Sequence, residues 1–284
     1  MNSISVPTEA VTIYNNALEL STRGDLATAL AEYRRAIDIY PGFVEAYNNI
    51  GEIHSGMGNS DLAVSAYLQA LTIEKHYRVL LNIGVEYYNS GRPEKALQYF
   101  LDSLTMKPDF LEGNYYAGLI FYDDKKYKEA ETYLGRVINI DMKHMKANYI
   151  LSYIYYEWKQ YEKVLACLDN IKDTADDKSF IKKYYGFCCY YLGRFTEAVD
   201  YLTEALESQP RYAKFKTYLQ NLTYESKVKE VGDVEKAIKE LEKNMLGERP
   251  AVSEISRLSM LYIFKGQNKK AEKLLMNYKA KIAS

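Results

Sequence analysis

The sequence predicts an all-α solenoid built from a helix–turn–helix unit that recurs about eight times. The first observation is a small residue followed four positions later by a large one, repeated at steps of 33 or 34 residues with one step of 39. The second is a glycine-containing turn signal between the predicted helices of most units. The third is a proline after several of the predicted second helices. Together these observations predict pairs of antiparallel helices along nearly the whole chain.

The small residues of the predicted second helices are Ala29, Ala63, Ala96, Ala130, Val164, Ala198, Ala237 and Ala271. The large residues that follow them are Tyr33, Tyr67, Phe100, Leu134, Leu168, Leu202, Leu241 and Leu275. A second set of small residues, in the first helices, comprises Ala17, Gly51, Gly84, Gly118, Ser152 and Gly186. Small residues allow two helices to approach closely, and we expect the large residue to fill the next interface.

The turn signals place a glycine where the first helix of a unit should end. These glycines are Gly24, Gly58, Gly91, Gly193, Gly232 and Gly266. Glycine adopts the left-handed conformation that ends many helices, so we expect that conformation at these positions. Pro41, Pro108 and Pro210 fall where a second helix should end, and proline cannot continue a helix.

These positions resemble the signature of the tetratricopeptide repeat family. One unit runs Tyr47-x-x-Ile50-Gly51-x-x-His54, followed by Gly58, Ala63, Tyr67 and Ala70. Another runs Tyr185-Gly186-x-x-Cys189, followed by Gly193, Phe195, Ala198, Leu202, Ala205 and Pro210. The resemblance implies a right-handed superhelix whose first helices line a concave surface, and it implies a protein-binding function.

We place a leader at 1–9 and six regular units at 10–43, 44–76, 77–110, 111–144, 145–178 and 179–212. Two divergent units follow at 213–251 and 252–284, which we expect to be basic and capping. The unit at 213–251 is longer than the others and its first helix lacks the small residue, so we expect looser or shifted packing there. Val164 should have little effect. We expect a polar outer face on the last helix, formed by Lys269, Lys270, Lys273, Lys279 and Lys281.

Charge is unevenly distributed along the chain. Residues 211–284 carry a net charge of +7, whereas the whole chain carries −1. The interpretation that we favour is a solvated capping face, because lysine suits exposed helices. One alternative is that the basic units dock an acidic partner. Another is self-association between the acidic N-terminal and the basic C-terminal units.

Composition excludes several classes of protein. The near-zero net charge argues against nucleic-acid binding driven by phosphate neutralisation. No apolar run reaches the length of about 18 residues that a membrane span requires, and the first residues lack the features of a secretory signal. Three cysteines, two of them adjacent, cannot form a disulfide framework. We therefore expect a cytoplasmic protein that binds no nucleic acid and does not insert into a membrane.

Asparagines recur on the face that the resemblance assigns to the groove, at Asn15, Asn49 and Asn82. An asparagine side chain both donates and accepts a hydrogen bond, so it can hold a peptide backbone of any sequence. The column resembles the asparagine ladder of some peptide-binding family members. The alternative is that asparagine is simply a common polar surface residue. The carboxylate clamp of other members is disfavoured, since only Asn49 and Arg78 fit its positions among Tyr14, Leu18, Asn49, Arg78 and Asn82.

A column of tyrosines on the same predicted inner face is the main candidate binding surface. It consists of Tyr88, Tyr122, Tyr156 and Tyr190, and its neighbours on the same face are Tyr115, Tyr149, Tyr153 and Tyr184. Tyrosine combines a large apolar ring with a hydroxyl group, which suits an interface. The alternative is packing between helices, which we expect for Tyr87, Phe121 and Tyr155. We favour the binding face, because contiguous exposed aromatic residues usually mark binding sites.

No catalytic or metal-binding pattern emerges from the sequence. His54, His76 and His144 lack the spacing of metal ligands, and Cys188-Cys189 is not a CxxC pair. We expect His54 and Cys189 to be packed in the core, and the pairs Asp123-Asp124 and Asp176-Asp177 to cap helix N-termini. The sequence thus predicts no enzyme and no cofactor. It predicts a protein–protein interaction scaffold that binds a peptide segment in the concave groove; the alternative is a structural subunit of a larger assembly.

Overall fold

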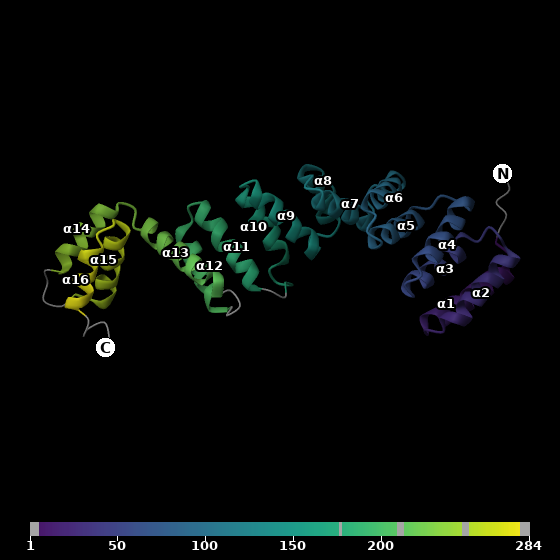
Figure 1. Ribbon diagram of the computed structural model, residues 1–284, viewed down its shortest axis with the longest axis horizontal. Coiled ribbons are helices and arrows are strands. Elements are labelled where there is room, and N and C mark those ends of the chain that lie inside the picture. The colour runs from purple at the N-terminus through teal and green to yellow at the C-terminus, as the bar shows by residue number, and fades with distance from the viewer. Residues whose placement is uncertain (1–5, 176–177, 209–212, 246–249, 279–284) are drawn as a thin grey trace. The chain divides into compact units, whose positions relative to one another are not determined.

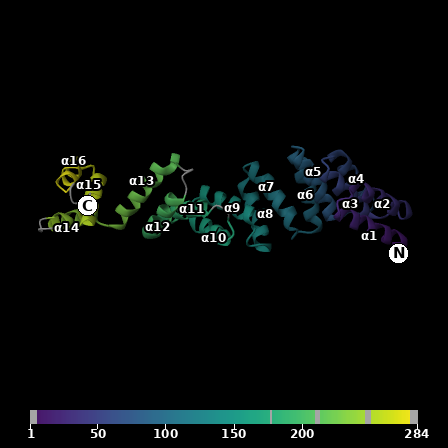
Figure 2. The same cartoon turned by 90° about the horizontal axis from the view of Figure 1, so that it is seen from below.

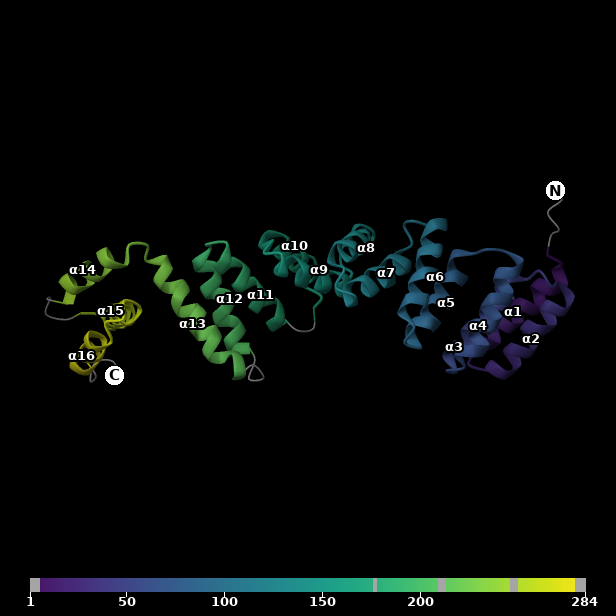
Figure 3. The same cartoon turned by 45° about the horizontal axis from the view of Figure 1, so that its top comes forward.

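The computed structural model describes residues 6–175, 178–208, 213–245 and 250–278, with the backbone alone described at 208 and 213–220. Within these residues the chain forms sixteen α-helices and no strand, so the predicted all-α fold is confirmed. Consecutive helices pack against each other along each part of the chain, as α1 with α2 and α11 with α12 (Figure 1, Figure 2 and Figure 3).

The chain divides into two compact parts, Met1–Ile154 and Tyr155–Ser284. The first part contains α1 (Thr8–Thr22), α2 (Leu26–Ile39), α3 (Val44–Gly56), α4 (Ser60–Ile73), α5 (Tyr77–Asn89), α6 (Pro93–Met106), α7 (Leu111–Asp123), α8 (Tyr127–Ile140) and most of α9 (Met145–Glu157). The second contains α10 (Tyr161–Ile171), α11 (Lys178–Tyr191), α12 (Phe195–Ser208), α13 (Ala213–Glu230), α14 (Val234–Met245), α15 (Val252–Phe264) and α16 (Asn268–Asn277).

Contact between a small residue of the first helix and a large residue of the second holds each regular helix pair together. A Cβ atom added to Gly84 would lie 2.5 Å from the ring of Phe100. One added to Gly118 would lie 2.7 Å from the side chain of Leu134. The same relation joins Gly51 to Tyr67 and Gly186 to Leu202. The large residue therefore fills the interface of its own pair. In the first pair it also reaches the next interface, as the sequence led us to expect, because Tyr33 shares a core with Ala46 and Ile50 of α3.

The turns between paired helices follow one hydrogen-bonding scheme, except the turn between α13 and α14. Gly24 has a φ of +85°, and the amide of Asp25 donates to the carbonyl of Leu20 across the end of α1. This is the Schellman arrangement, in which a residue in the left-handed conformation ends the helix. The left-handed conformation is confirmed at all six glycines predicted to adopt it. Lys125 and Lys159 adopt it in the two pairs that lack glycine there, with φ values of 60° and 58°.

The packing changes at the long unit, as the missing small residue led us to expect. Ala237 on α14 is half-buried, whereas Ala198 at the same repeat position on α12 is 0% exposed. The helix α13 has 18 residues and contacts α12 and α15. The C-terminal core combines Val228 of α13 with residues of α14, α15 and α16. Val164, by contrast, is fully buried, so its departure from the pattern has little effect.

The polar outer face expected on the last helix stays a prediction, and apolar side chains are exposed beside its lysines. Lys269 and Lys273 are exposed there, but Leu275 and Met276 are 38% and 67% exposed beside them. Other predictions fall outside the described residues, namely those on Lys279, Lys281, Pro210 and Asp176-Asp177 and on most of the leader at 1–9. The helix α1 begins at Thr8, and the boundaries proposed for the repeat units remain predictions.

Candidate protein-binding surface

A polar pocket lies among the first helices of the three N-terminal pairs, α1, α3 and α5. It has a volume of about 400 Å³. It is lined by Tyr14, Val44, Glu45, Asn48, Asn49, Glu52, His76, Tyr77, Arg78 and Val79. Residues of the second helices do not line it, because they pack within and between the pairs. The pocket therefore forms on the face to which the sequence assigned the groove.

One side of this pocket is organised by the carboxylate of Glu52. The Nδ2 atom of Asn48 donates to Glu52 Oε1 at 2.8 Å. The Nδ2 atom of Asn82, on the next first helix, donates to Asn48 Oδ1 at 3.0 Å and lies 3.4 Å from Glu52 Oε1. These contacts link α3 to α5 and fix the orientation of three side chains at the pocket.

Asn49 connects the pocket to the first helix pair. Its Nδ2 atom donates to the hydroxyl of Tyr14 at 3.0 Å and to that of Tyr33 at 3.1 Å. Burial raises the pKa of Tyr14 above its ordinary value, and the nearby carboxylates of Glu45 and Glu52 act in the same direction. The hydrogen bond from Asn49 acts in the opposite direction but does not outweigh burial, so Tyr14 stays neutral at physiological pH.

The opposite edge of the pocket carries positive charge. The Arg78 Nε atom donates to the Tyr77 hydroxyl at 3.3 Å, and Lys107 Nζ lies 4.8 Å from the centre of the Tyr77 ring. The hydrogen bond from Arg78 lowers the pKa of Tyr77. With Glu45 and Glu52 exposed on α3, the pocket presents carboxylates on one side and a guanidinium on the other. Such a pocket can bind groups of both signs, as a peptide segment supplies.

The predicted asparagines are therefore not equivalent. Asn49 lines the pocket, and Asn82 is hydrogen-bonded to two residues that line it. The amide nitrogens of both already donate to neighbouring side chains, so a bound backbone would have to use their oxygen atoms or displace these contacts. Asn15 is exposed on α1 and does not line the pocket. The structure thus brings two of the three predicted rungs together.

In the first part of the chain, several of the predicted tyrosines pack against other aromatic rings, in edge-to-face or tilted arrangements. Tyr122 contacts Tyr153 with ring centroids 5.8 Å apart. Tyr88 and Tyr115 both contact the ring of Tyr116, at 6.0 Å and 5.5 Å. Tyr153 is 40% exposed, while Tyr88, Tyr115, Tyr122 and Tyr149 are half-buried. The tyrosines therefore contribute to packing between helices and still reach the surface. The interpretation as packing residues and the interpretation as a binding face each describe part of their surface.

The second part of the chain contains a similar aromatic group. Tyr156 lies 5.6 Å from Tyr184 and 6.5 Å from Tyr191 between ring centroids. The hydroxyl of Tyr190 donates to Glu225 Oε2 at 2.8 Å and accepts from Lys229 Nζ at 2.7 Å. These contacts join α11 to α13, so Tyr190 has a packing role. Tyr156, Tyr184 and Tyr190 are all half-buried.

Sequence reasoning missed two charged residues and one amide of the pocket. Glu45, Asn48 and Glu52 occupy inner-face positions of the second unit, the same positions that were examined for tyrosine in later units. Applying that helical spacing to polar residues as well as aromatic ones would have identified them. Tyr14 and Arg78 were considered only as positions of a carboxylate clamp, Tyr14 as a departure from it and Arg78 as a fit, yet both line the pocket.

The residues considered for chemical reactivity, His54, Cys188 and Cys189, are buried. His54 is 9% exposed and its Nδ1 atom is buried without a hydrogen-bond partner, in agreement with the expected packing. Cys188 and Cys189 are 0% exposed, and burial raises the pKa values of their thiols to about 12 and about 11. Such thiols are protonated at neutral pH and react slowly. In the described ranges, His, Cys, Asp and Glu form no group of three that could hold a metal ion.

The expectation that Asp123-Asp124 caps a helix N-terminus is wrong. Asp123 is the last residue of α7, and Asp124 follows it as the C-cap. The carboxylate of Asp124 lies 3.1 Å from Lys126 Nζ, in an exposed ion pair. Burial and the adjacent Asp124 raise the pKa of Asp123.

Among the helices that the structure describes, none is long and apolar enough to cross a membrane.

Family models match most of the helical repeats. Models of the tetratricopeptide repeat match residues 22–58, 44–77 and 81–141. A model described as anaphase-promoting complex, cyclosome, subunit 3 matches residues 123–205. The matches overlap in part and together extend from residue 22 to residue 205, a range that contains α2 to α11 and most of α12.

Individual proteins show the same similarity at low sequence identity. Anaphase-promoting complex subunit 3 of Schizosaccharomyces pombe is 24% identical over 160 residues, which cover 56% of this chain and 24% of that protein. Human tetratricopeptide repeat protein 6 is 25% identical over 122 residues, which cover 43% of this chain and 24% of that protein. The chain therefore spans about a quarter of the length of these relatives.

Solved structures agree on the fold. The structure of PilF from Pseudomonas aeruginosa superposes with a TM-score of 0.59 at 19% identity, covering 75% of this chain and 96% of that one. At this identity the likeness concerns the fold alone. Together with the repeated small and large residues and the glycine-ended turns, the family matches identify the chain. It belongs to the tetratricopeptide repeat family.

Proposed function

We propose that the chain is a non-enzymatic scaffold that binds a segment of another protein along the face formed by its first helices. The observation that carries this proposal is the polar pocket among α1, α3 and α5. Its side chains are held in place by the hydrogen bonds of Asn48, Asn49 and Glu52. Preorganised polar groups reduce the ordering cost of binding. Exposed tyrosine edges such as that of Tyr153 provide apolar area for partner side chains.

The pocket also indicates which partner residues fit. The carboxylates of Glu45 and Glu52 favour a lysine or arginine side chain of the bound segment, and Tyr14 adds an aromatic wall. Arg78 on the opposite edge favours a carboxylate or a backbone carbonyl. The partner is thus a peptide segment with at least one basic residue. A cytoplasmic location stays a prediction from the sequence.

A charge reversal in the pocket tests this function. Affinity capture with the intact chain from an extract of its own cells, followed by mass spectrometry, identifies partners. Glu45→Lys reverses an exposed charge in the first turn of α3. Glu94→Lys makes the same change in the first turn of α6, outside the pocket. We expect Glu45→Lys to lose the partner and Glu94→Lys to retain it; equal capture by both variants would refute the pocket as the binding site.

A second candidate function is that of a structural subunit in a larger assembly. The match to the model of anaphase-promoting complex subunit 3 over residues 123–205 favours it, because that relative is itself a subunit of a complex. The basic net charge of residues 211–284 suggests an end-to-end contact, either with an acidic neighbour or with the acidic units of a second copy. Light scattering at two salt concentrations distinguishes the cases. A salt-sensitive oligomer supports assembly through the ends, and a strict monomer at high concentration argues against self-association.

A further inference from the structure

Leu275, the large residue of the last helix pair, is exposed, whereas the large residues at the same repeat position of the other pairs are buried. In the preceding seven pairs the corresponding side chain is at most 8% exposed, whereas Leu275 is 38% exposed. In the first pair, Tyr33 at this position is 1% exposed, and it shares a core with Ala46 and Ile50 of the following helix α3. The difference indicates that a following helix normally completes the burial of this position.

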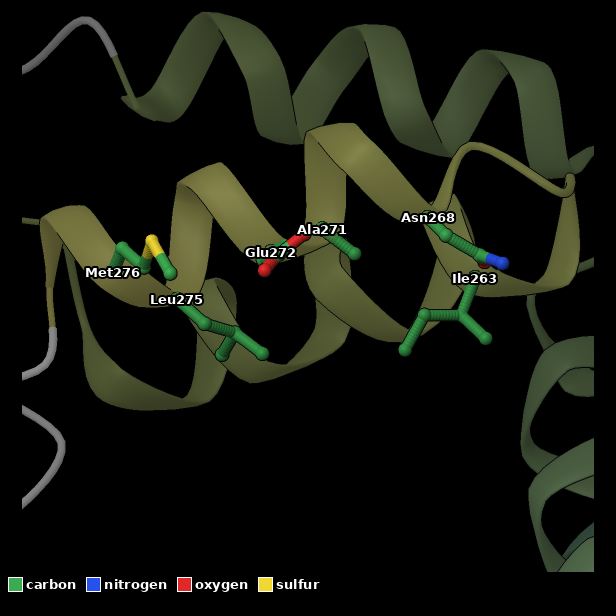
Figure 4. Close-up of a pocket in the computed structure, with 6 residues that line it drawn as sticks. All are labelled: Ile263, Asn268, Ala271, Glu272, Leu275 and Met276. Atoms are coloured by element: carbon green, nitrogen blue, oxygen red, sulfur yellow. The ribbon is translucent and has the colours of Figure 1, made fainter.

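An apolar groove marks the place on the last pair that such a helix would cover. The groove has a volume of about 560 Å³ and is lined by Ile263, Asn268, Ala271, Glu272, Leu275 and Met276 (Figure 4). Ile263 and Leu275 point to the same side of the two helices in Figure 4. Ile263 is 47% exposed and Met276 is 67% exposed. Two neighbouring helices therefore present a shallow, mostly apolar groove, the kind of surface into which an amphipathic helix packs.

The charges beside the groove determine which helix suits it. Lys269 and Lys273 are exposed one turn apart on α16. The recorded ion pairs of the last helix pair use other lysines: Lys270 pairs with Glu242 at 3.5 Å and Lys265 with Glu235 at 2.9 Å. Among the described residues, Lys269 and Lys273 have no carboxylate oxygen within 4 Å. With three lysines and one glutamate, Glu272, α16 is basic overall.

We propose that the α15–α16 groove docks an amphipathic helix of a partner protein whose apolar stripe is flanked by acidic residues. The apolar stripe would cover Ile263, Leu275 and Met276, as α3 covers Tyr33 in the first pair. The acidic residues would pair with Lys269 and Lys273. A second copy of the chain fits less well, because α1 carries only Glu9 and Glu19 and its exposed large apolar residue is Leu18.

Two synthetic peptides test the proposal on the intact chain. Each has about 14 residues, or about four helical turns, with leucine at positions i, i+3, i+4 and i+7. One peptide carries glutamate beside the leucine stripe, and the other carries lysine at the same positions. Fluorescence anisotropy measures their binding. We expect the glutamate peptide to bind at least about tenfold more tightly, because like charges repel the lysine peptide.

Variants at exposed positions assign the binding to this groove. Lys269→Glu with Lys273→Glu should reverse the preference between the peptides, and Met276→Glu should weaken the binding of both while leaving the fold intact, since Met276 is 67% exposed. Glu94→Lys on α6, which lines neither this groove nor the polar pocket, should leave peptide binding unchanged. Equal binding of the two peptides, no binding, or no effect of Met276→Glu would overturn the proposal. Self-association that Met276→Glu abolishes would also overturn it, by assigning the groove to a second copy.

Discussion

The regular helix pairs and the last pair share the same repeat positions, but the large residue is buried in the regular pairs and exposed in the last pair. In the regular pairs, a glycine of the first helix receives the large side chain of the second, as Gly186 receives Leu202. In the last pair, Ser259 occupies the first position and is buried, but Leu275 is 38% exposed. The residue type is the same at Leu202 and Leu275, so the difference arises from the neighbouring helix. In a solenoid, the environment of a residue depends on the adjacent units.

Truncation of Leu202 and of Leu275 should give the largest difference in stability between the regular pairs and the last pair. Leu202 is 0% exposed, so Leu202→Ala removes buried methyl groups and leaves a cavity, at a cost of about 3 kcal/mol. Leu275→Ala at the exposed position should cost less than about 1 kcal/mol. Hydrogen exchange of the amides in α11 and α12, and in α15 and α16, reports each local stability. Similar losses for both variants would show that Leu275 is covered in solution.

Addition of one methyl group tests the close approach within the regular pairs. Gly84→Ala places a Cβ atom 2.5 Å from Phe100, so the helices must separate, at a cost of about 2 kcal/mol. The matched control is Gly135→Ala on α8, where no atom lies within 4 Å of the new Cβ. It should stabilise the chain by about 0.5–1 kcal/mol through helix propensity. Urea unfolding followed by circular dichroism compares them, and a neutral Gly84→Ala would rule out the glycine–aromatic contact.

Substitutions in the turns of the regular pairs should change the stability by a smaller amount, and replacing a turn lysine by glycine should increase it. Lys125 and Lys159 have positive φ values where other pairs have glycine. A side chain in the left-handed conformation is strained, so Lys125→Gly or Lys159→Gly should stabilise the chain by about 0.5–1 kcal/mol. Gly91→Lys, at the same position of the α5–α6 pair, should destabilise it by a similar amount. Thermal melts of the three variants provide the measurement; a loss of stability in both glycine variants would contradict the strain.

The sequence carries most of the information about the fold and less about the site. The period of small and large residues predicts the helix pairs because each pair repeats the same local contact, as Gly84 does with Phe100. The left-handed lysines escaped prediction, since tertiary packing imposes that conformation against the preference of lysine. The exposure of Leu275 escaped it too, because its residue type matches that of buried leucines.

The pocket residues were partly predictable. The helical spacing places Asn49 and Asn82 on the face that carries the pocket. The spacing alone does not reveal that Asn49 donates to Tyr14 and Tyr33, because those contacts depend on how adjacent pairs stack. Likewise, the tyrosine column is regular in sequence, yet Tyr190 is hydrogen-bonded to Glu225 and Lys229 of a helix that begins in the divergent region.

The affinity of a captured partner segment for paired tyrosine variants tests most directly whether the first helices form the binding face. The variant Tyr122→Ala with Tyr156→Ala alters half-buried tyrosines of first helices. Its control, Tyr99→Ala with Tyr133→Ala, alters half-buried tyrosines of second helices. Isothermal titration calorimetry should show a loss of about 2 kcal/mol or more for the first variant and little change for the control, with helical content near wild type in both. Unchanged affinity in Tyr122→Ala with Tyr156→Ala, or an equal loss in the control, would contradict a binding face on the first helices.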